Sequence, residues 1–130
     1  MASQLTEHGL RILHDAVALW LTTLRADGSP HTTPVWFLYR EERVWIATGG
    51  RNAKVSNVVR DPRVSLAVDG SAGMPMVGEG RVVVHDVESA PGFVIRGLAE
   101  KYDGWDVRDA AVDGRRALLE IVVERWLLSY

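Results

Sequence analysis

Six runs rich in aliphatic and aromatic residues constrain the fold of this chain more than any other feature of its sequence. Such runs are typical of β-strands, and the segments between them carry turn residues or the periodicity of short helices. The pattern predicts an α+β domain built on a closed or nearly closed, six-stranded, mostly antiparallel barrel. The expected strands are Ala16–Leu24, His31–Arg40, Arg43–Thr48, Arg63–Val68, Met76–Ser89 and Ala117–Tyr130.

The connections add detail to this prediction. Asp27-Gly28 is a hairpin signal between the first two strands, and Gly78 and Gly80 predict a bend or bulge in the long fifth strand. A helix is expected over residues 3–15, capped by Ser3 or Thr6, with Leu5, Leu10 and Leu13 on one face. Further helices are expected after Gly49-Gly50 and over residues 90–102. Residues 103–116 are expected to form a loop with a short helix, in which four aspartates cap and solubilise the loop rather than bind calcium.

Composition limits the classes of function. With 130 residues, of which 47% are hydrophobic and 25% charged, residues 1–130 are expected to form a single domain. The net charge of −2 gives no overall positive field, which argues against nucleic-acid and membrane partners and requires any anion site to be local. There is no cysteine, and the four histidines lack metal-ligand spacing, so no metal site is expected. Without a secretory signal pattern or a bilayer-length apolar run, we expect a cytoplasmic protein.

The second strand is apolar on both faces. Val35, Phe37 and Tyr39 point to one side, while Trp36 and Leu38 point to the other. A barrel wall buries only its inner face, so the second apolar face needs another covering surface. A homodimer interface is the simplest candidate, and flanking helices are the alternative.

Pro30 and Pro34 lie in the same strand-forming segment. Proline has no N–H to donate to a sheet, so the strand must be an edge, a bulge or a segment whose backbone meets something else. A flat heteroaromatic ligand that bonds backbone N–H and C=O groups is one such partner. The alternative is an irregular edge strand with a packing tryptophan.

The segment Thr48–Asn57, TGGRNAKVSN, has the features of a phosphate cradle. Two glycines between a strand and a helix allow close approach of a ligand, and a helix start offers unpaired amides and the positive end of a dipole. Arg51 and Lys54 are three residues apart and can both lean over that helix start. The alternative is a plain strand–turn–helix with solvated basic residues.

Taken together, these segments resemble the amino-terminal half of the pyridoxamine-5'-phosphate-oxidase-like split-barrel family. The shared pattern comprises Gly28, Pro30, Pro34-Val35-Trp36-Phe37, Thr48, Lys54, Asn57 and the run Asp61–Leu66. Within that family the chain is most similar to the flavin/deazaflavin oxidoreductase group, which uses coenzyme F420 or FMN. The resemblance implies a split β-barrel homodimer with two cofactor sites at the subunit interface. It places the phosphate-bearing tail near Thr48, Arg51 and Lys54, and the ring along Thr33 to Trp36. The implied cofactor-binding residues are Thr33, Pro34, Val35, Trp36, Thr48, Gly49, Arg51, Asn52, Ala53, Lys54 and Asn57.

The chain departs from true pyridoxamine-phosphate oxidases at the cations of the second strand. Thr33 and Leu38 lie near the positions where those enzymes carry basic residues for the flavin phosphate. We therefore expect coenzyme F420 rather than FMN, and no vitamin-B6 oxidase activity. The expected function is hydride transfer from the reduced deazaflavin to an unsaturated small-molecule acceptor, since the cofactor supplies the difficult chemistry. The alternatives are an FMN-dependent reductase or oxidase, and a non-catalytic flavin- or haem-binding protein. The sequence identifies no catalytic residue or proton donor.

Overall fold

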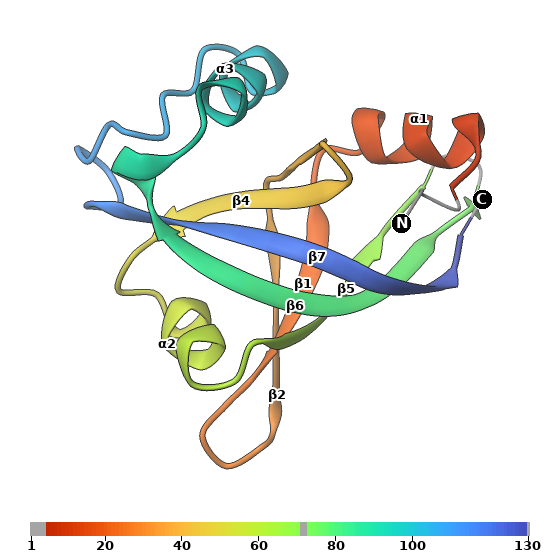
Figure 1. The fold of residues 1–130 in the computed structure, drawn as a ribbon, viewed down its shortest axis with the longest axis horizontal. Helices are drawn as coiled ribbons and strands as arrows, with labels where there is room; N and C mark the ends of the chain where they lie inside the picture. The colour runs from red at the N-terminus through yellow and green to blue at the C-terminus, as the bar shows by residue number, and fades with distance from the viewer. Residues whose placement is uncertain (1–4, 71–72, 130) are drawn as a thin grey trace.

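The computed structural model describes residues 5–70 and 73–129. These residues form one seven-stranded antiparallel sheet, in the order β2-β1-β5-β6-β7-β4-β3, with three α-helices around it, which confirms the expected α+β class. The sheet curls into a half-barrel (Figure 1). No helix in this part of the chain is long and apolar enough to cross a membrane. The strands are β1 (Leu19–Leu24), β2 (Pro30–Val35), β3 (Leu38–Arg40), β4 (Arg43–Gly49), β5 (Arg63–Val68), β6 (Met76–Asp86) and β7 (Arg116–Leu128). The helices are α1 (Glu7–Asp15), α2 (Ala53–Arg60), α3 (Gly92–Lys101) and the short 3₁₀ helix η2 (Val87–Ser89).

The two faces of the sheet bury different clusters. The concave face holds the inner core, to which α1 adds Leu13 and α2 adds Val58. The convex face of β4 and β7 is covered by α3. Leu38, from the second apolar face that the sequence predicts, packs against the same cluster, so a flanking helix covers part of that face. Strand residues of the inner core include Leu19, Leu21, Val44, Ile46, Val64, Leu66, Val68, Met76, Val82, Leu119 and Ile121. The outer cluster comprises Trp45, Ala47, Val87, Val94, Leu98, Val107 and Leu118.

The expectation of six strands is wrong, because the predicted second strand is two strands. The run His31–Arg40 breaks at Trp36 and Phe37, between β2 and β3. At the break, the N–H of Phe37 donates to the Tyr102 hydroxyl, and its carbonyl accepts from Lys101 Nζ at 2.9 Å. Side chains from the end of α3 thus replace a neighbouring strand at Phe37.

The prolines of β2 occupy positions that tolerate them. β2 is an edge strand paired only with β1, and the N–H of Arg25 donates to the carbonyl of Ser29 at the hairpin end. Antiparallel pairing alternates, so His31, Thr33 and Val35 direct their backbone groups toward β1. Pro30, Thr32 and Pro34 therefore face the open edge. The prolines remove donors from that edge and hinder its pairing with another strand.

The glycines of β6 mark irregular pairing, as predicted. The register between β6 and β7 shifts between Val77 and Gly78 and again between Glu79 and Gly80. A Cβ on Gly80 would lie 2.0 Å from the carbonyl oxygen of Val122, so no larger residue fits without backbone movement. The two shifts confirm the predicted bulge region of this long strand.

The expected Thr6 cap is present, but the predicted burial of Leu10 and the predicted helix within residues 103–116 are wrong. Thr6 caps α1 by accepting from the N–H of Gly9, while Ser3 lies outside the described residues. Leu10 is 40% exposed, and Ile12 takes its expected place in the core. The short helix expected within residues 103–116 is absent, since this segment consists of turns in the structure. Its carboxylates bond neighbouring groups instead, which gives the turns local support.

Candidate functional site

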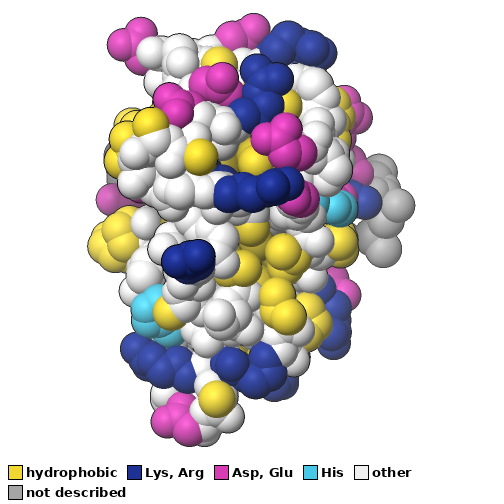
Figure 2. Space-filling model, turned by 90° about the vertical axis from the view of Figure 1, so that its left-hand side faces the viewer, with side chains coloured by type: hydrophobic (Ala, Val, Ile, Leu, Met, Phe, Trp, Pro, Cys, Tyr) yellow, Lys and Arg dark blue, Asp and Glu magenta, His cyan; other side chains and the backbone are white. Residues whose placement is uncertain are grey.

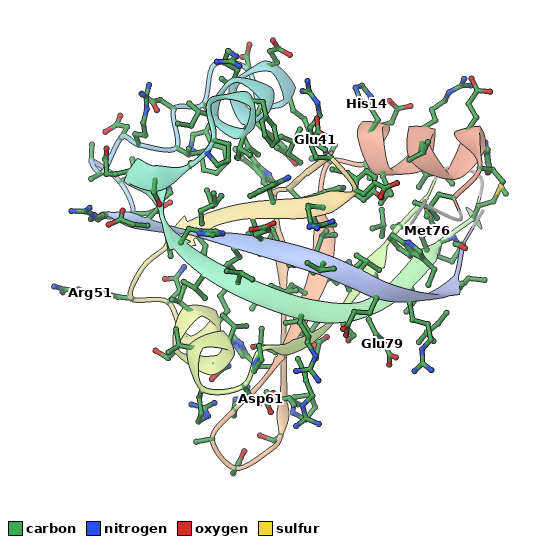
Figure 3. The ribbon with its side chains drawn as sticks, in the orientation of Figure 1. His14, Glu41, Arg51, Asp61, Met76 and Glu79 are labelled. Carbon is green, nitrogen blue, oxygen red and sulfur yellow. The ribbon has the colours of Figure 1, made fainter. Side chains whose placement is uncertain are left out.

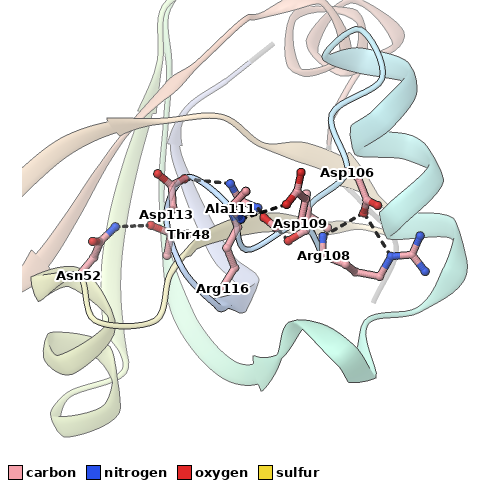
Figure 4. Close-up of polar contacts among 9 residues, drawn as sticks. Thr48, Asn52, Asp106, Arg108, Asp109, Ala111, Asp113 and Arg116 are labelled. Atoms are coloured by element: carbon pink, nitrogen blue, oxygen red, sulfur yellow. Dashed lines mark hydrogen bonds and ion pairs between the residues drawn. The ribbon is translucent and has the colours of Figure 1, made fainter.

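The end of β4 and the start of α2 form an uncapped helix N-terminus. Asn52 stands at the capping position, but its side chain donates to the Thr48 hydroxyl at 2.9 Å instead of capping the helix (Figure 4). The first turn of α2 carries no acidic residue. The helix start therefore keeps its partial positive charge, which favours an anion.

Two basic side chains flank this helix start. Lys54 is half-buried, and desolvation lowers its pKa. Arg51 is exposed and projects outward from the β4–α2 connection (Figure 3). Within the described residues, neither side chain has a hydrogen-bond or ion-pair partner. A half-buried ammonium group without a counter-ion is unfavourable by itself, and a bound anion would relieve that cost.

The structure connects this cradle to β2. Asn57 follows Lys54 by three residues on α2, and its amide donates to the Thr23 hydroxyl at 3.0 Å. Thr23 in turn is the cross-strand partner of His31 in the β1–β2 pair. Residues three apart lie on the same side of a helix, so Lys54 is on the side of α2 that contacts the β1–β2 pair at Thr23.

Two buried polar atoms on the inner face of β2 have no hydrogen-bond partner. They are His31 Nδ1 and Thr33 Oγ1, and only Arg43 Nε and Arg116 Nε share this condition within the described residues. An unpaired buried polar atom costs about 1–3 kcal/mol. A ligand rich in oxygen atoms that reached this face of β2 after small rotations of these side chains would supply the missing partners.

Pro34 and Trp36 face the other side of the strand. Trp36 is 45% exposed. Its ring stacks on Tyr102, with centroids 4.4 Å apart and planes 3° from parallel, and meets Trp105 edge-on at 5.2 Å. One face of the Trp36 ring is thus covered by protein. Val35, which the sequence predicts to line the ring, instead packs its side chain against the inner core.

Other predicted site residues have partners within the protein. The Asn57 amide is buried and also accepts from Arg60, so its side chain holds α2 against β1. A Cβ on Gly49 would lie 3.2 Å from both Asn52 Oδ1 and the Asp113 carbonyl. Glycine there allows close packing of the connection against residues 113–115, and the N–H of Gly50 is bonded to Arg115. Ala53 is exposed at the first position of α2.

Arg116 organises the loop beside the cradle, a role that the sequence analysis missed. It is 6% exposed, and its guanidinium donates to the carbonyls of Val107 and Asp109 and to the carboxylate of Asp113 (Figure 4). The same group lies 5.1 Å from the centre of the Trp105 ring. Arg116 begins β7 opposite Gly49, so it joins the loop to the strand that carries the cradle. An arginine next to a second arginine in a polar stretch gives no sequence signal of burial.

A cavity of about 700 Å³ lies beside this junction. Arg51 and Arg115 contribute basic groups to its wall, and Asp86 and Asp113 contribute acidic ones. Arg115 pairs with Asp86, and Arg116 pairs with Asp113. Arg51 is therefore the cation of this wall that has no carboxylate partner within the described residues.

A third group of charged side chains lies on the convex face. Nε2 of His85 is 2.8 Å from Glu120, and Arg43 Nε is 3.4 Å from the other oxygen of the same carboxylate. The three residues come from β6, β7 and β4. They form a cross-strand polar cluster, and the described residues hold no group of three His, Asp or Glu side chains that could bind a metal.

Comparison with known proteins identifies the family. The pyridoxamine 5'-phosphate oxidase family model matches residues 5–130. The chain belongs to this family. The match spans nearly the whole chain, so the resemblance seen in Pro34–Phe37, Lys54 and the Asp61–Leu66 run is confirmed.

Comparison with individual proteins agrees with this family assignment. The chain is 30% identical over 131 residues to the F420H2-dependent biliverdin reductase of Mycobacterium tuberculosis, covering 98% of this chain and 90% of that protein. A solved F420 reductase is 19% identical, with a TM-score of 0.76 over 97% of this chain and 98% of the other. A conserved hypothetical protein of M. tuberculosis is 23% identical, with a TM-score of 0.75 over 94% and 82% of the two chains. The two structural likenesses show the shared fold.

Proposed function

We propose that this protein is a coenzyme F420-dependent oxidoreductase. The observation that carries the proposal is the unpaired, half-buried Lys54 at an uncapped helix start, one helical turn before Asn57, which bonds β1 at Thr23. This arrangement suits the phosphate group of a cofactor tail. The 30% identical relative is an F420H2-dependent enzyme, which supports a deazaflavin as the cofactor.

Different residues would bind different parts of such a cofactor. Lys54, Arg51 and the first amides of α2 bind the anionic tail, and Thr33 adds a hydroxyl. Beside them, the open edge of β2 offers the N–H of Thr32 and the carbonyls of Thr32 and Pro34. This mixture complements the N–H and C=O groups on the pyrimidine part of a deazaflavin ring. The reduced deazaflavin, when bound, is the hydride donor, so the protein needs no nucleophile of its own.

Charge favours F420 over FMN. Thr33 on β2 and Leu38 on β3 supply no cation for a short phosphate tail, whereas Arg51 extends positive charge from the cradle into the neighbouring cavity of about 700 Å³. A tail that carries carboxylates beyond its phosphate would reach this group. Figure 2 shows basic side chains above, below and within a region of uncharged and hydrophobic side chains on this side of the molecule, with acidic side chains among the upper ones.

We further propose a homodimer and an unsaturated organic acceptor. Trp20, Val83, Leu127 and Leu128 are large apolar side chains that remain exposed on the sheet, and a second copy of the chain would cover them. The acceptor would receive the hydride from the deazaflavin ring while the site excludes water. Light scattering at several protein concentrations tests the dimer.

The test of the function is a pair of titrations followed by turnover. The purified protein is titrated separately with F420 and with FMN, while tryptophan fluorescence and the heat of binding are recorded. Saturable binding of F420, at least tenfold tighter than that of FMN, is expected. Oxidation of F420H2 in the presence of a quinone, enone or tetrapyrrole, with no oxidation of NADH or NADPH, would then establish the reaction class. Binding of FMN alone would favour the flavin enzyme, and absence of both signals would refute the proposal.

A further inference from the structure

We infer that His31 is a second ligand for the phosphate group of the cofactor tail, alongside Lys54. This inference rests on the proposed function and goes beyond it, because neither the family pattern nor the cradle motif includes this histidine.

The side chain of His31 lies on the inner face of β2. His31, Thr33 and Val35 alternate with the exposed residues of this edge strand and share one face. His31 stands opposite Thr23, which is almost fully buried. Opposite residues in an antiparallel pair have Cβ atoms about 5 Å apart, so the His31 and Thr23 side chains are neighbours on the inner face.

The neighbouring polar groups are already engaged with one another. The Thr23 hydroxyl accepts from Asn57, and Asn57 accepts in turn from Arg60. His31 Nδ1, in contrast, is buried and has no partner, and the same holds for Thr33 Oγ1 two residues further along this face. Two of the four unpartnered buried side-chain atoms in the described residues thus belong to adjacent inward positions of one strand.

The third unmet group is the ammonium of Lys54 on α2, the helix that bonds Thr23. It lies on the side of α2 that contacts Thr23 through Asn57, and its pKa is lowered by burial. A phosphate group satisfies an ammonium, a hydroxyl and an imidazole N–H at once, because its oxygens accept several hydrogen bonds in different directions. A ribityl hydroxyl satisfies one of them and neutralises no charge. The three groups together therefore favour phosphate as the partner of His31.

The test separates the phosphate from the rest of the cofactor. Dissociation constants are measured for F420 and for the phosphate-free deazaflavin that carries only the ring and the ribityl chain. His31→Leu removes the donor, and His31→Asn keeps an amide N–H at the position of Nδ1. His14→Leu is the matched control, since His14 is exposed on α1 and its imidazole bonds only Asp15. His31→Leu is expected to weaken F420 binding about tenfold, as loss of one hydrogen bond to a charged group predicts.

The expected pattern has three further parts. His31→Leu changes the affinity for the phosphate-free compound by less than twofold, His31→Asn stays within threefold of the wild type for F420, and His14→Leu behaves as the wild type. Equal loss for both compounds, or unchanged F420 affinity in His31→Leu, would overturn the role of His31. If the wild type binds neither F420 nor FMN, the proposed function fails as well. Should His31→Leu not fold, the imidazole ¹⁵N shifts of the wild type decide: Nδ1 of His31 moves on addition of F420 and stays fixed with the phosphate-free compound.

Discussion

The Tyr102 hydroxyl lies within hydrogen-bond distance of both backbone polar groups of Phe37, a residue 65 positions earlier in the chain. The oxygen lies 2.9 Å from the nitrogen of Phe37 and 3.0 Å from its carbonyl oxygen, and 2.7 Å from the carbonyl of Val17. A phenol has one proton, so the hydroxyl accepts from the N–H and donates to one of the two carbonyls. This contact fixes the break between β2 and β3, next to the Trp36 ring.

Replacing Tyr102 by Phe is therefore expected to destabilise the fold while the ring stacking on Trp36 remains. The N–H of Phe37 loses its acceptor in a partly buried position, which costs about 1–3 kcal/mol. The free energy of unfolding in urea measures this change. Tyr102→Leu, which also removes the stacked ring, should lose more. A Tyr102→Phe protein as stable as the wild type would contradict a structural role for the hydroxyl.

Lys101 gives the protein an unusual pH dependence in the alkaline range. Desolvation lowers the pKa of Lys101 from 10.5 to about 8, with Asp15 opposing part of the shift. Between these two values the unfolded chain binds more protons than the folded one, so stability rises as the pH increases from about 8. The side chain is partly exposed, and screening reduces the expected gain to about 1 kcal/mol. Burial raises the pKa of Tyr102, which opposes this trend above pH 10.

Urea denaturation at pH 7.5 and pH 9.5 tests this expectation. The wild type should gain stability relative to Lys101→Met between the two values, because the methionine variant lacks the titrating group. Parallel behaviour of the two proteins would show that Lys101 keeps an ordinary pKa in the fold.

Much of the fold follows from the sequence, since strands β4 and β5 and the faces of Val35, Phe37 and Trp36 are where the hydrophobic pattern predicts them. The break at Phe37 could not be predicted, because Tyr102 and Lys101 cause it from the other end of the chain. Local patterns predict the strand–turn–helix that carries Lys54, but not the tertiary contacts around it. Lys54 and its helix start are close in sequence, whereas the contacts of Thr23 with Asn57 and of Arg116 with the loop depend on tertiary packing.

Arg116 is expected to be the most sensitive residue of the loop between α3 and β7. Its guanidinium satisfies two carbonyls and one carboxylate at a buried position, and the fork geometry cannot be reproduced by lysine. Arg116→Lys should destabilise the protein by about 2–3 kcal/mol and increase proteolysis within residues 103–115. Arg108→Lys, at an exposed position of the same loop, is the control and should change stability by less than about 0.5 kcal/mol.

The turn between β3 and β4 offers a stabilising substitution. Glu41 and Glu42 have φ angles of 55° and 57°. Residues other than Gly and Asn adopt this left-handed conformation at an energetic cost. Replacing the pair by Asn-Gly should raise the free energy of unfolding by about 1 kcal/mol. Thermal unfolding measures the change. A loss of stability would show that the contacts of the two glutamates outweigh the backbone conformation.

Lys54 should show opposite effects on stability and on cofactor affinity. Its ammonium is half-buried without a partner within the described residues, so Lys54→Met is expected to leave the free protein as stable as the wild type or slightly more so. The same substitution should weaken F420 binding by roughly 1.5–3 kcal/mol, because a charge-assisted bond to the tail is lost. Arg51→Met, at the exposed end of the cradle, should weaken binding less, since solvent screens its interaction with the tail. Isothermal calorimetry and thermal unfolding of the three proteins, with and without F420, measure both quantities. Equal affinity in the wild type and Lys54→Met would place the tail elsewhere, and a larger loss in Arg51→Met would move the anion site outward into the cavity beside Arg115.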